Sequence, residues 1–348
     1  MILPQAMLTP SADTIRFGAG IAASDITLTR NGMDVALGIN GTTDQVTIQS
    51  WGAGNDYRIE RVEFADGAAW DAAQLQALVS AAPAIGTEGS DYLEGYAGEN
   101  TTLQGLGGDD YLILIGGGGS DVLRDNSGGN LLDGGSGSDT MTGNAGNEFF
   151  LGGIGNDTIT VDNGADVIVF NRNDGQDILN GGIGTDNTLS LGGGIQYSDL
   201  ALSKSGNDLI LEAGNGDQIN LKNWYATTDN YKSVLNLQVV ADAITGFDRA
   251  LIDPLLSKSI QNFDFTAIVN VFDQAHGGST NFMHWNATNS LLAAHLSASD
   301  STALGGDLAY QYGKNGSLAG IGQTAAQEVI NAAQFGSQTQ VLKTFVGL

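Results

Sequence analysis

The sequence predicts a mainly β protein that is organised around a solenoid of short repeats. The stretch from Gly134 to Thr160 divides into three blocks of nine residues, GGSGSDTMT, GNAGNEFFL and GGIGNDTIT. Glycine supplies 51 of the 348 residues, about twice its usual share of ~7%. A fixed period of this kind indicates repeats that are stable only when each turn rests on its neighbours.

Each nine-residue block has a turn part and a strand part. The first and third blocks share the template Gly-Gly-x-Gly-x-Asp, followed by three residues with an apolar centre that suit a very short strand. Glycine enters positive φ at little cost, so the first six residues suit a turn. The Asp at the sixth position recurs at a fixed translation, and such aligned carboxylates repel unless a cation lies between them. Carboxylate and backbone carbonyl oxygens are the ligands that calcium prefers.

The blocks GGSGSDTMT and GGIGNDTIT resemble the nonapeptides of the repeats-in-toxin (RTX) proteins. The resemblance implies a parallel β-roll of Gly-Asp-rich nonapeptide repeats, with several Ca2+ ions bound between its turns. It also implies that successive turns lie on alternate sides of the roll, so that repeats two apart share an ion. Proteins of this family are exported by type I secretion systems. We therefore expect residues 85–191 to form an RTX calcium-binding parallel β-roll.

This alternation divides the sixth positions of the repeat region into two columns. The first column contains Asn100, Asp121, Asp139, Asp157 and Asp177. The second column contains Asp91, Asp110, Asn130, Glu148, Asp166 and Asp186. We expect firm calcium sites between successive aspartates of the first column, from Asp121 to Asp177. In the second column the best site lies between Asp91 and Asp110, while Asn130 and Glu148 fit spacers as well as ligands.

Three turns are longer than nine residues, and the register is open there. The turn that ends at Gln104 carries one extra residue, and those that start at Gly105 and Val161 carry two each. The other predicted calcium ligands are glycines of these and neighbouring turns, together with one aspartate that precedes Asp177. They are Gly89, Gly108, Gly116, Gly117, Gly119, Gly134, Gly135, Gly137, Gly152, Gly153, Gly155, Gly182, Gly184 and Asp174.

A second internal repeat lies outside the roll. Residues 18–51 and 192–224 can be aligned, and each copy ends at a Trp, Trp51 or Trp224. Short apolar or alternating runs between turn signals predict strands in both copies. We expect β-rich modules over residues 1–84, with a short helix at Trp70–Val79, and over residues 192–241. Both resemble the small domain that accompanies haemolysin-type calcium-binding repeats. Each Trp suits core packing more often than stacking on a sugar.

Residues 242–348 differ in composition, and we expect a mixed α/β C-terminal region there. The Gly-Asp period stops, and segments near Phe265–Asp273, Asn289–Leu296 and Thr324–Ala333 suit helices. Residues 295–338 resemble the extreme C-terminal region of large type I-secreted RTX proteins, which implies an uncleaved export signal. Such a signal would target the protein for secretion. The start MILPQAML has neither the basic region nor the cleavage signature of an N-terminal signal peptide.

Charge and composition narrow the classes of partner and activity. The chain has 13 Lys and Arg against 39 Asp and Glu, a net charge of −26, which disfavours nucleic acid and anionic membranes. It has no Cys, and no apolar run approaches the ~20 residues of a membrane span. The three His lack HExxH spacing, and neither a Gly-x-Ser-x-Gly elbow nor a Walker-type loop occurs. We therefore predict no catalytic residues, and Asp253-Pro254 suits a turn better than a cleavage site.

These observations predict the calcium-responsive C-terminal region of a larger bacterial RTX exoprotein. Such a region would fold on calcium outside the cell and engage the type I secretion machinery through its C-terminal part. Two alternatives remain open. One is a calcium-stiffened stalk or binding region of a surface adhesin, with a cell-surface or glycan partner. The other is the tail of a secreted enzyme or toxin whose catalytic domain lies upstream.

Overall fold

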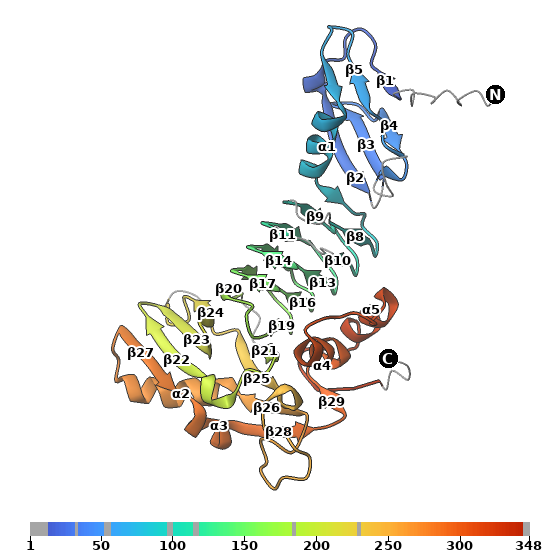
Figure 1. Ribbon diagram of the computed structural model, residues 1–348. Helices are drawn as coiled ribbons and strands as arrows, with labels where there is room; N and C mark the ends of the chain where they lie inside the picture. The colour runs from blue at the N-terminus through green and yellow to red at the C-terminus, as the bar shows by residue number, and fades with distance from the viewer. Residues whose placement is uncertain are drawn as a thin grey trace, which may run out of the picture. The chain divides into compact units, whose positions relative to one another are not determined.

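The computed structural model describes residues 13–31, 34–51, 57–95, 100–113, 118–182, 186–227 and 231–343. Strands predominate in this part of the chain, and all but one of its α-helices follow residue 264 (Figure 1). Contacts divide the protein into two compact units, Met1–Ile85 and Gly86–Leu348. The division into four regions therefore stays a prediction, because the roll and everything that follows it lie in one unit.

The first unit contains two small sheets and one helix. One sheet contains β1 (Thr14–Arg16), β5 (Arg61–Glu63) and β6 (Ala69–Asp71). The other contains β7 (Ala84–Ile85), β2 (Ile26–Asn31), β3 (Asp34–Ile39) and β4 (Gln45–Ile48) in that spatial order, after a 3-10 helix, η1 (Ala23–Asp25). Helix α1 (Ala72–Ala81) begins where Asp71 Oδ1 accepts the N–H of Gln74 at 2.8 Å. It buries Leu75 and Val79, as the apolar spacing predicts, whereas Leu78, expected on the same face, is 36% exposed.

The second unit begins with a parallel β-roll, which confirms the predicted fold class. Successive short strands alternate between two parallel sheets (Figure 1). One sheet contains β8 (Tyr92–Glu94), β10 (Tyr111–Ile113), β13 (Leu131–Asp133), β16 (Phe149–Leu151), β19 (Val167–Phe170) and β21 (Asn187–Leu191). The other contains β9 (Thr102–Gln104), β12 (Val122–Arg124), β15 (Thr140–Thr142), β18 (Thr158–Thr160) and β20 (Gln176–Asn180). A third ladder joins three turns through β11 (Gly118–Gly119), β14 (Ser136–Gly137) and β17 (Ile154–Gly155).

The two sheets of the roll bury a shared interior but differ on their outer faces. The apolar centres of the short strands, such as Leu123, Met141 and Phe150, are fully buried. In the sheet of β15 and β18 the residues flanking each centre are threonines, which stay partly exposed. In the sheet of β16 and β19 the flanking residues are apolar and buried as well. That sheet must therefore be covered on both faces.

The second copy of the module repeats the first at the level of single hydrogen bonds. It contains η4 (Tyr197–Asp199) and the antiparallel strands β22 (Ala201–Ser205), β23 (Asp208–Gly214) and β24 (Asp217–Lys222). Asp34 Oδ1 accepts the N–H of Ser50 at 2.7 Å in the first copy, and Asp208 Oδ1 accepts that of Asn223 at 2.9 Å in the second. The Trp that follows is 1–2% exposed in each copy, so both indoles serve core packing.

The C-terminal part extends the sheets of the roll and adds helices. Strands β25 (Val234–Val240), β26 (Ile260–Asp264) and β28 (His295–Ser299) continue the sheet beyond β21, while β27 (Asn281–Asn286) pairs with β22. The other elements are η5 (Ala241–Ala243), α2 (Phe265–His276), α3 (Thr288–Ala294), β29 (Thr302–Ala303), α4 (Gly306–Asn315), α5 (Gln323–Ile330) and β30 (Gln340–Val341). The three predicted helices exist as α2, α3 and α5, although α3 ends two residues early because β28 begins at His295.

Helices α4 and α5 cover the apolar outer face of the roll. One core cluster joins strand residues such as Phe149, Leu151 and Val167 with Leu308 and Val329 of these helices. Buried apolar area contributes about 25 cal/mol per Å², so this contact ties the end of the chain to the repeats. The all-apolar sequences FFL and VIVF were the signal for it in the sequence.

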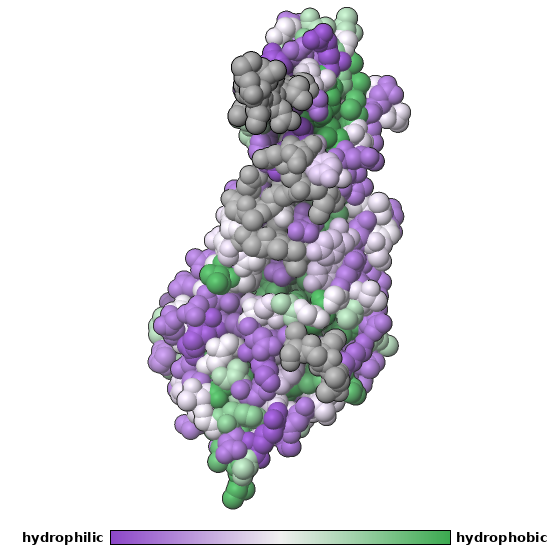
Figure 2. Space-filling view, turned by 45° about the vertical axis from the view of Figure 1, so that its right-hand side comes forward, coloured by the Kyte–Doolittle hydropathy of each residue, from purple (hydrophilic) through white to green (hydrophobic). Residues whose placement is uncertain are grey.

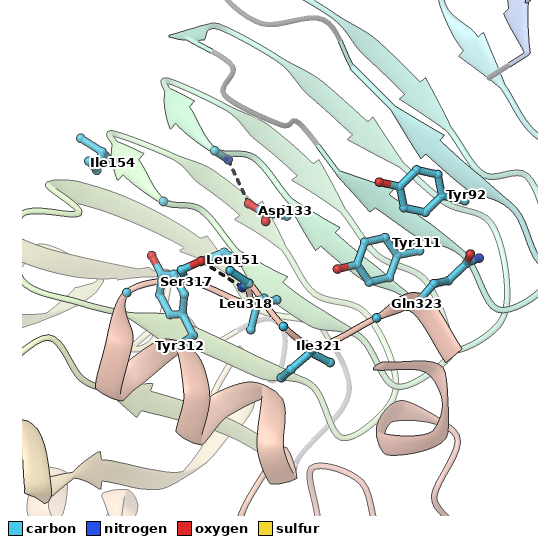
Figure 3. Close-up of a pocket in the computed structure, with 16 residues that line it drawn as sticks. Tyr92, Tyr111, Asp133, Leu151, Ile154, Tyr312, Ser317, Leu318, Ile321 and Gln323 are labelled. Atoms are coloured by element: carbon cyan, nitrogen blue, oxygen red, sulfur yellow. Dashed lines mark hydrogen bonds between the residues drawn. The ribbon is translucent and has the colours of Figure 1, made fainter. Parts of the chain in front are cut away.

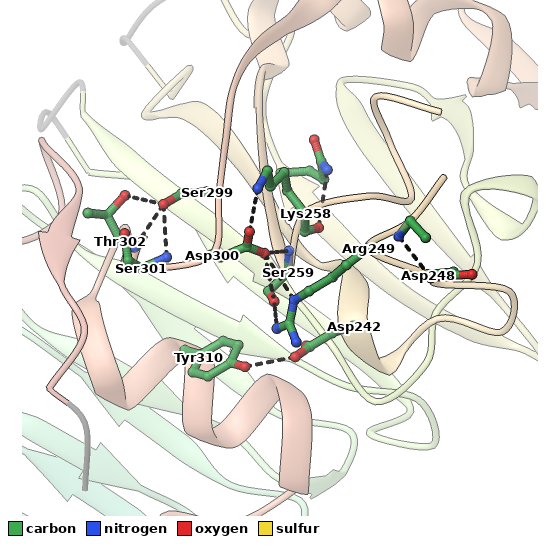
Figure 4. Close-up of polar contacts among 12 residues, drawn as sticks. Asp242, Asp248, Arg249, Lys258, Ser259, Ser299, Asp300, Ser301, Thr302 and Tyr310 are labelled. Carbon is green, nitrogen blue, oxygen red and sulfur yellow. Dashed lines mark hydrogen bonds and ion pairs between the residues drawn. The ribbon is translucent and has the colours of Figure 1, made fainter. Parts of the chain in front are cut away.

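A long loop between β25 and β26 is fastened at its base by Asp300 (Figure 4). The carboxylate of Asp300 accepts hydrogen bonds from Lys258 Nζ at 2.5 Å and from the N–H of Ser259 at 3.0 Å, and it pairs with Arg249. Burial alone would raise the pKa of Asp300, but these donors outweigh it and hold the pKa at about 2. Asp300 is therefore ionised throughout the physiological pH range.

The visible surface is mainly polar, with small scattered apolar patches (Figure 2). This agrees with the net charge of −26. Within the described ranges, every helix is too short or too polar to span a bilayer.

Candidate metal centres

Strand register aligns the aspartates of the first column. Parallel pairing places Thr140 opposite Val122 and Thr158 opposite Thr140, so the residues before them stand in one line. Each aspartate accepts the backbone N–H of the one before it through Oδ1. The distances are 2.9 Å for Asp121 to Asp139, 2.8 Å for Asp139 to Asp157 and 2.9 Å for Asp157 to Asp177.

The second carboxylate oxygen of this column lies in the turn without a donor. Oδ2 of Asp121, Asp139 and Asp157 is buried and has no hydrogen-bond partner among the described residues. In Asp139 and Asp157 this oxygen lies beside the first glycine of its own turn, Gly134 or Gly152. A Cβ placed on Gly134 would lie 2.7 Å from Asp139 Oδ2 and 2.9 Å from the carbonyl oxygen of Gly152 in the turn two repeats on. Oxygens of two turns therefore converge beside Gly134, as a hard cation requires.

Without a counter-charge these carboxyl groups ionise less readily than an ordinary aspartate. Burial, and then the neighbouring aspartates, raise the pKa of Asp139 to about 7 and that of Asp177 to about 8. Burial raises the pKa of Asp157 to about 6, against a backbone hydrogen bond that lowers it. The charged column is thus unstable by itself and fits a divalent cation, which would compensate both burial and repulsion.

The glycines of these turns pack backbone against backbone. Gly137 has φ of +130°, and a Cβ there would come 1.6 Å from the carbonyl oxygen of Gly119. A Cβ on Gly153 would come 1.9 Å from that of Gly135, and one on Gly155 only 1.4 Å from that of Gly137. Among the residues with described positions, no three His, Cys, Asp or Glu side chains gather as one ligand group. A cation here would therefore draw on backbone carbonyls as well as aspartates.

The second column has the same hydrogen-bonded ladder with different residues. Asp110 Oδ1 accepts the N–H of Asp91 at 2.8 Å, and Asn130 Oδ1 accepts that of Asp110 at 2.7 Å. Further along, Asp166 Oδ1 accepts the N–H of Glu148 at 2.9 Å. Asn130 therefore occupies an aspartate position as a neutral link of the ladder.

The predicted place of Asp186 in this column is wrong. Strand β21 pairs Thr188 with Val167, so Asn187 is the residue that gives Oδ1 to the N–H of Asp166, at 2.8 Å. The same kind of shift occurs in the first column, where the N–H of Thr101 donates to Asp121 Oδ1 and Asn100 lies one position earlier. Asn100 falls in a turn with an extra residue, and the step from Asp177 to Asn187 is ten residues instead of the nine expected, so the nine-residue count alone does not show where a bulge lies.

Glu148 and Asp125 form an acidic centre that sequence reasoning described incompletely. Glu148 is fully buried, and both its carboxylate oxygens lack a hydrogen-bond partner within the described chain. Burial and the charge of Asp166 raise the pKa of Glu148 to about 10. Asp125 was not predicted, yet its Oδ1 is buried and unpartnered while Oδ2 accepts from Asn130 Nδ2 and Asn144 Nδ2 at 2.5 and 3.1 Å. In the sequence, Asp125 could have been recognised as an acidic residue at the first position of its turn, where most other turns have glycine.

The remaining predicted residues are two aspartates that already accept hydrogen bonds, two glycines within the stack of turns, and three glycines outside the described residues. Asp91 Oδ2 already accepts hydrogen bonds from Thr87, and Asp174 Oδ2 accepts the N–H of Asn171 at 2.6 Å. Gly89 lies against Gly108 in the stack, and Gly182 lies against Asp162. Three predicted glycines fall outside the described residues: Gly116, Gly117 and Gly184.

Comparisons with known proteins assign both the roll and the first module. Residues 85–114, 115–149 and 142–172 match the RTX calcium-binding nonapeptide repeat, and residues 34–74 match the haemolysin-type calcium binding protein related domain. The chain is similar to the iron-regulated protein FrpA of Neisseria meningitidis serogroup C, with 37% identity over 103 residues. That match covers 28% of this chain and 9% of FrpA.

Among solved structures, the extracellular lipase LipA from Serratia marcescens matches at 18% identity and a TM-score of 0.24. The match covers 44% of this chain and 40% of the lipase chain, so this chain spans a minor part of both proteins. The β-roll itself rests on the strand pairing described above. Residues 85–172 are therefore RTX calcium-binding nonapeptide repeats, which bind several Ca2+ ions, and residues 34–74 are similar to the domain related to haemolysin-type calcium-binding proteins.

Proposed function

We propose that this chain is a calcium-triggered folding and export region of a secreted bacterial protein. The observation that carries the proposal is the line of buried carboxylate oxygens without donors at Asp121, Asp139 and Asp157. Bound calcium would supply positive charge and ligand bonds to these oxygens. The role is non-enzymatic, and the ligands are the aspartates of the two columns with the carbonyls of their glycine turns.

The composition of the roll makes its folding depend on calcium. Buried carboxylates with raised pKa values oppose closure of the roll at neutral pH, and ordering the many glycines costs backbone entropy. Several ions that bind only the folded form each add RT ln(1 + [L]/Kd). In a bacterial cytosol with little free calcium the roll stays open, and an open chain can thread an exporter. Outside, calcium in the ~10⁻⁴–10⁻³ M range of extracellular modules closes it.

In this proposal, the C-terminal region makes export from the cell directional. Its helices α4 and α5 cover the outer face of the roll through residues such as Leu308 and Val329. A segment that leaves the cell first, carrying the export signal, would then meet each repeat as it emerges. Docking against strands β13, β16 and β19 would favour a stacked roll outside the cell. The proposed location is therefore extracellular.

Calcium titration of the whole chain tests the proposal. In EDTA, circular dichroism should show most β signal lost and a chain that proteases digest. Millimolar calcium should restore the signal cooperatively with several ions bound, whereas magnesium should fail because it demands tighter octahedral geometry. Equal spectra with calcium and with chelator would overturn the folding switch.

A further inference from the structure

A groove of about 630 Å³ lies in the second unit, and the first-column turns at Gly135 and Gly153 border it (Figure 3). Its floor is the outer face of β8, β10, β13 and β16. One wall is formed by the repeat turns at Gly135, Gly153 and Ile154, and the other by the loop from Gly316 to Gln323. We call it the tyrosine groove after three of its lining residues, Tyr92, Tyr111 and Tyr312. Its size suits a small organic ligand and greatly exceeds a bare ion.

The groove combines one carboxylate with several hydroxyl groups. Among the described residues that line it, Asp133 alone carries a formal charge. Asp133 Oδ1 accepts the N–H of Gly135 at 3.2 Å, the one hydrogen bond described for this side chain, so acceptor capacity remains. Burial raises the pKa of Asp133 to about 7. A single acidic group with no lining cation excludes anionic ligands such as phosphates and sulfated chains.

The tyrosines present their edges to the groove. The rings of Tyr92 and Tyr111 stack on each other with centroids 5.5 Å apart and planes 16° apart. One face of each ring is therefore used against the other ring, and the hydroxyl ends point toward the centre of the group in Figure 3. A cage for an organic cation needs open aromatic faces instead. Hydroxyl edges, which both donate and accept, suit a ligand that is itself rich in hydroxyl groups.

We propose that the tyrosine groove binds a short neutral saccharide. Asp133 would accept hydrogen bonds from sugar hydroxyls. Tyr111 would donate or accept beside it, and Tyr92, whose hydroxyl donates to Glu94 Oε2 at 3.5 Å, would accept. Leu151, Leu318 and Ile321 line the same space and would receive the apolar face of a sugar ring. Charge-assisted bonds to a carboxylate are the strongest of these contacts.

The inference rests on the proposed function in one respect. Asp133 and Tyr111 belong to repeat strands, and the loop 316–323 is placed by α4 and α5, so the groove exists only when the roll is stacked. If calcium drives that stacking, then saccharide binding depends on calcium.

Isothermal titration calorimetry on the full chain tests the groove, with neutral di- to tetrasaccharides of the maltose, cellobiose, lactose and chitobiose series as probes. Spermidine and a sulfated tetrasaccharide serve as charged comparison probes. In millimolar calcium, we expect at least one neutral series to bind. Asp133→Asn should weaken binding about tenfold or more, and Tyr92→Phe about fivefold. Tyr57→Phe, at a 55% exposed tyrosine of the first unit, should change nothing.

Tyr92 is 39% exposed, so Tyr92→Phe keeps the test valid even if Asp133→Asn does not fold. Three results would overturn the inference: neutral probes that do not bind at tens of millimolar, binding unchanged by Tyr92→Phe, or binding of a charged probe instead. Circular dichroism of the same samples separates the two proposals. Calcium-dependent β signal without saccharide binding removes this inference alone, and saccharide binding by a roll that ignores chelator removes the proposed switch alone.

Discussion

Asp139 accepts the backbone N–H of Asp121 at 2.9 Å with one carboxylate oxygen, while the other oxygen is buried and has no partner in the described part of the chain. Asp157 stands in the same relation to Asp139 at 2.8 Å. A buried polar atom without a partner costs roughly 1–3 kcal/mol, and more when it is charged. Protonation or cation binding at this line of aspartates should therefore stabilise the roll. Replacing one of the aspartates should lower the affinity of the roll for cations.

Asp139→Asn should remove two predicted ion sites at once. Asp139 is predicted to bind both the ion between it and Asp121 and the ion between it and Asp157. Asn keeps the Oδ1 acceptor for the N–H of Asp121 but loses the charge. We expect the midpoint of calcium-induced folding to rise by roughly tenfold, with fewer ions bound by titration calorimetry. Asp248→Asn, in an exposed turn, is the matched control. An unchanged midpoint and stoichiometry in Asp139→Asn would remove this column from the calcium sites.

Acid should stabilise the metal-free roll. The pKa values of Asp157, Asp139 and Asp177 are raised to about 6, 7 and 8, above the ~3.9 of an unfolded aspartate. Between these limits the folded form binds more protons than the unfolded form, so its stability is present below pH ~4 and falls as pH rises to about 8. Urea unfolding in EDTA from pH 5 to 8.5 measures this. Stability that increases over that range would contradict the prediction.

Calcium affinity should change with pH in the opposite direction. Protons compete with the ion for the same oxygens, so affinity should rise from pH 6 to 8 as the column ionises. Asp157→Asn should flatten both dependences, which distinguishes titration of this column from general effects of pH.

What can be predicted of the roll from its sequence depends on where the nine-residue period holds. Period and apolar centres predicted the parallel roll, because residues such as Met141 and Ile159 can be buried only by stacking. The period also predicted the line of Asp121, Asp139 and Asp157, which lie 18 residues apart. Counting failed at Asp186, since an extra residue in a turn moves every later position by one, and only the pairing of Thr188 with Val167 fixes the register.

The covered outer face of the roll was missed for a different reason. Only the apolar centres of short strands such as TMT and TIT were interpreted, so the flanking apolar residues of FFL and VIVF carried no prediction. An apolar residue on each side of the centre is a separate signal, since the two faces of a strand alternate. Asp125 was missed because the template expected glycine there, and a template cannot show that a carboxylate in that place points at Asp110.

Glu148→Gln should decide whether Glu148 is a ligand or a spacer. The pKa of about 10 means that the metal-free roll holds Glu148 protonated at pH 7, and Gln resembles that neutral form. We therefore expect little change in metal-free stability, within about 0.5–1 kcal/mol, but loss of an ion from the second column. Calcium stoichiometry by equilibrium dialysis is the measurement. A full complement of ions in the variant would make Glu148 a spacer.

Gly137→Ala should prevent the turns from stacking. The new Cβ would come 1.6 Å from the carbonyl oxygen of Gly119, at φ of +130°, so the ladder must open. We expect a loss of at least ~3 kcal/mol in the free energy of unfolding with calcium present. Gly206→Ala is the control, since Gly206 also has positive φ, +60°, but a Cβ there would meet no atom within 4 Å; it should cost only ~1 kcal/mol. Similar losses in both variants would show that backbone strain, rather than close stacking, sets the cost.

Leu308→Ala should detach the C-terminal helices without emptying the calcium sites. Leu308 is fully buried in the cluster that covers the outer face of the roll, and such truncations cost ~2–5 kcal/mol. None of the first-column aspartates belongs to that cluster. We therefore expect residues 306–343 to become sensitive to limited proteolysis in calcium, while the number of ions bound to the first column is unchanged. Leu292→Ala, at a 61% exposed leucine of α3, should leave the fragments as in the parent chain. If Leu308→Ala instead abolished calcium binding, the helices would be part of the folding nucleus of the roll rather than a cover added to it.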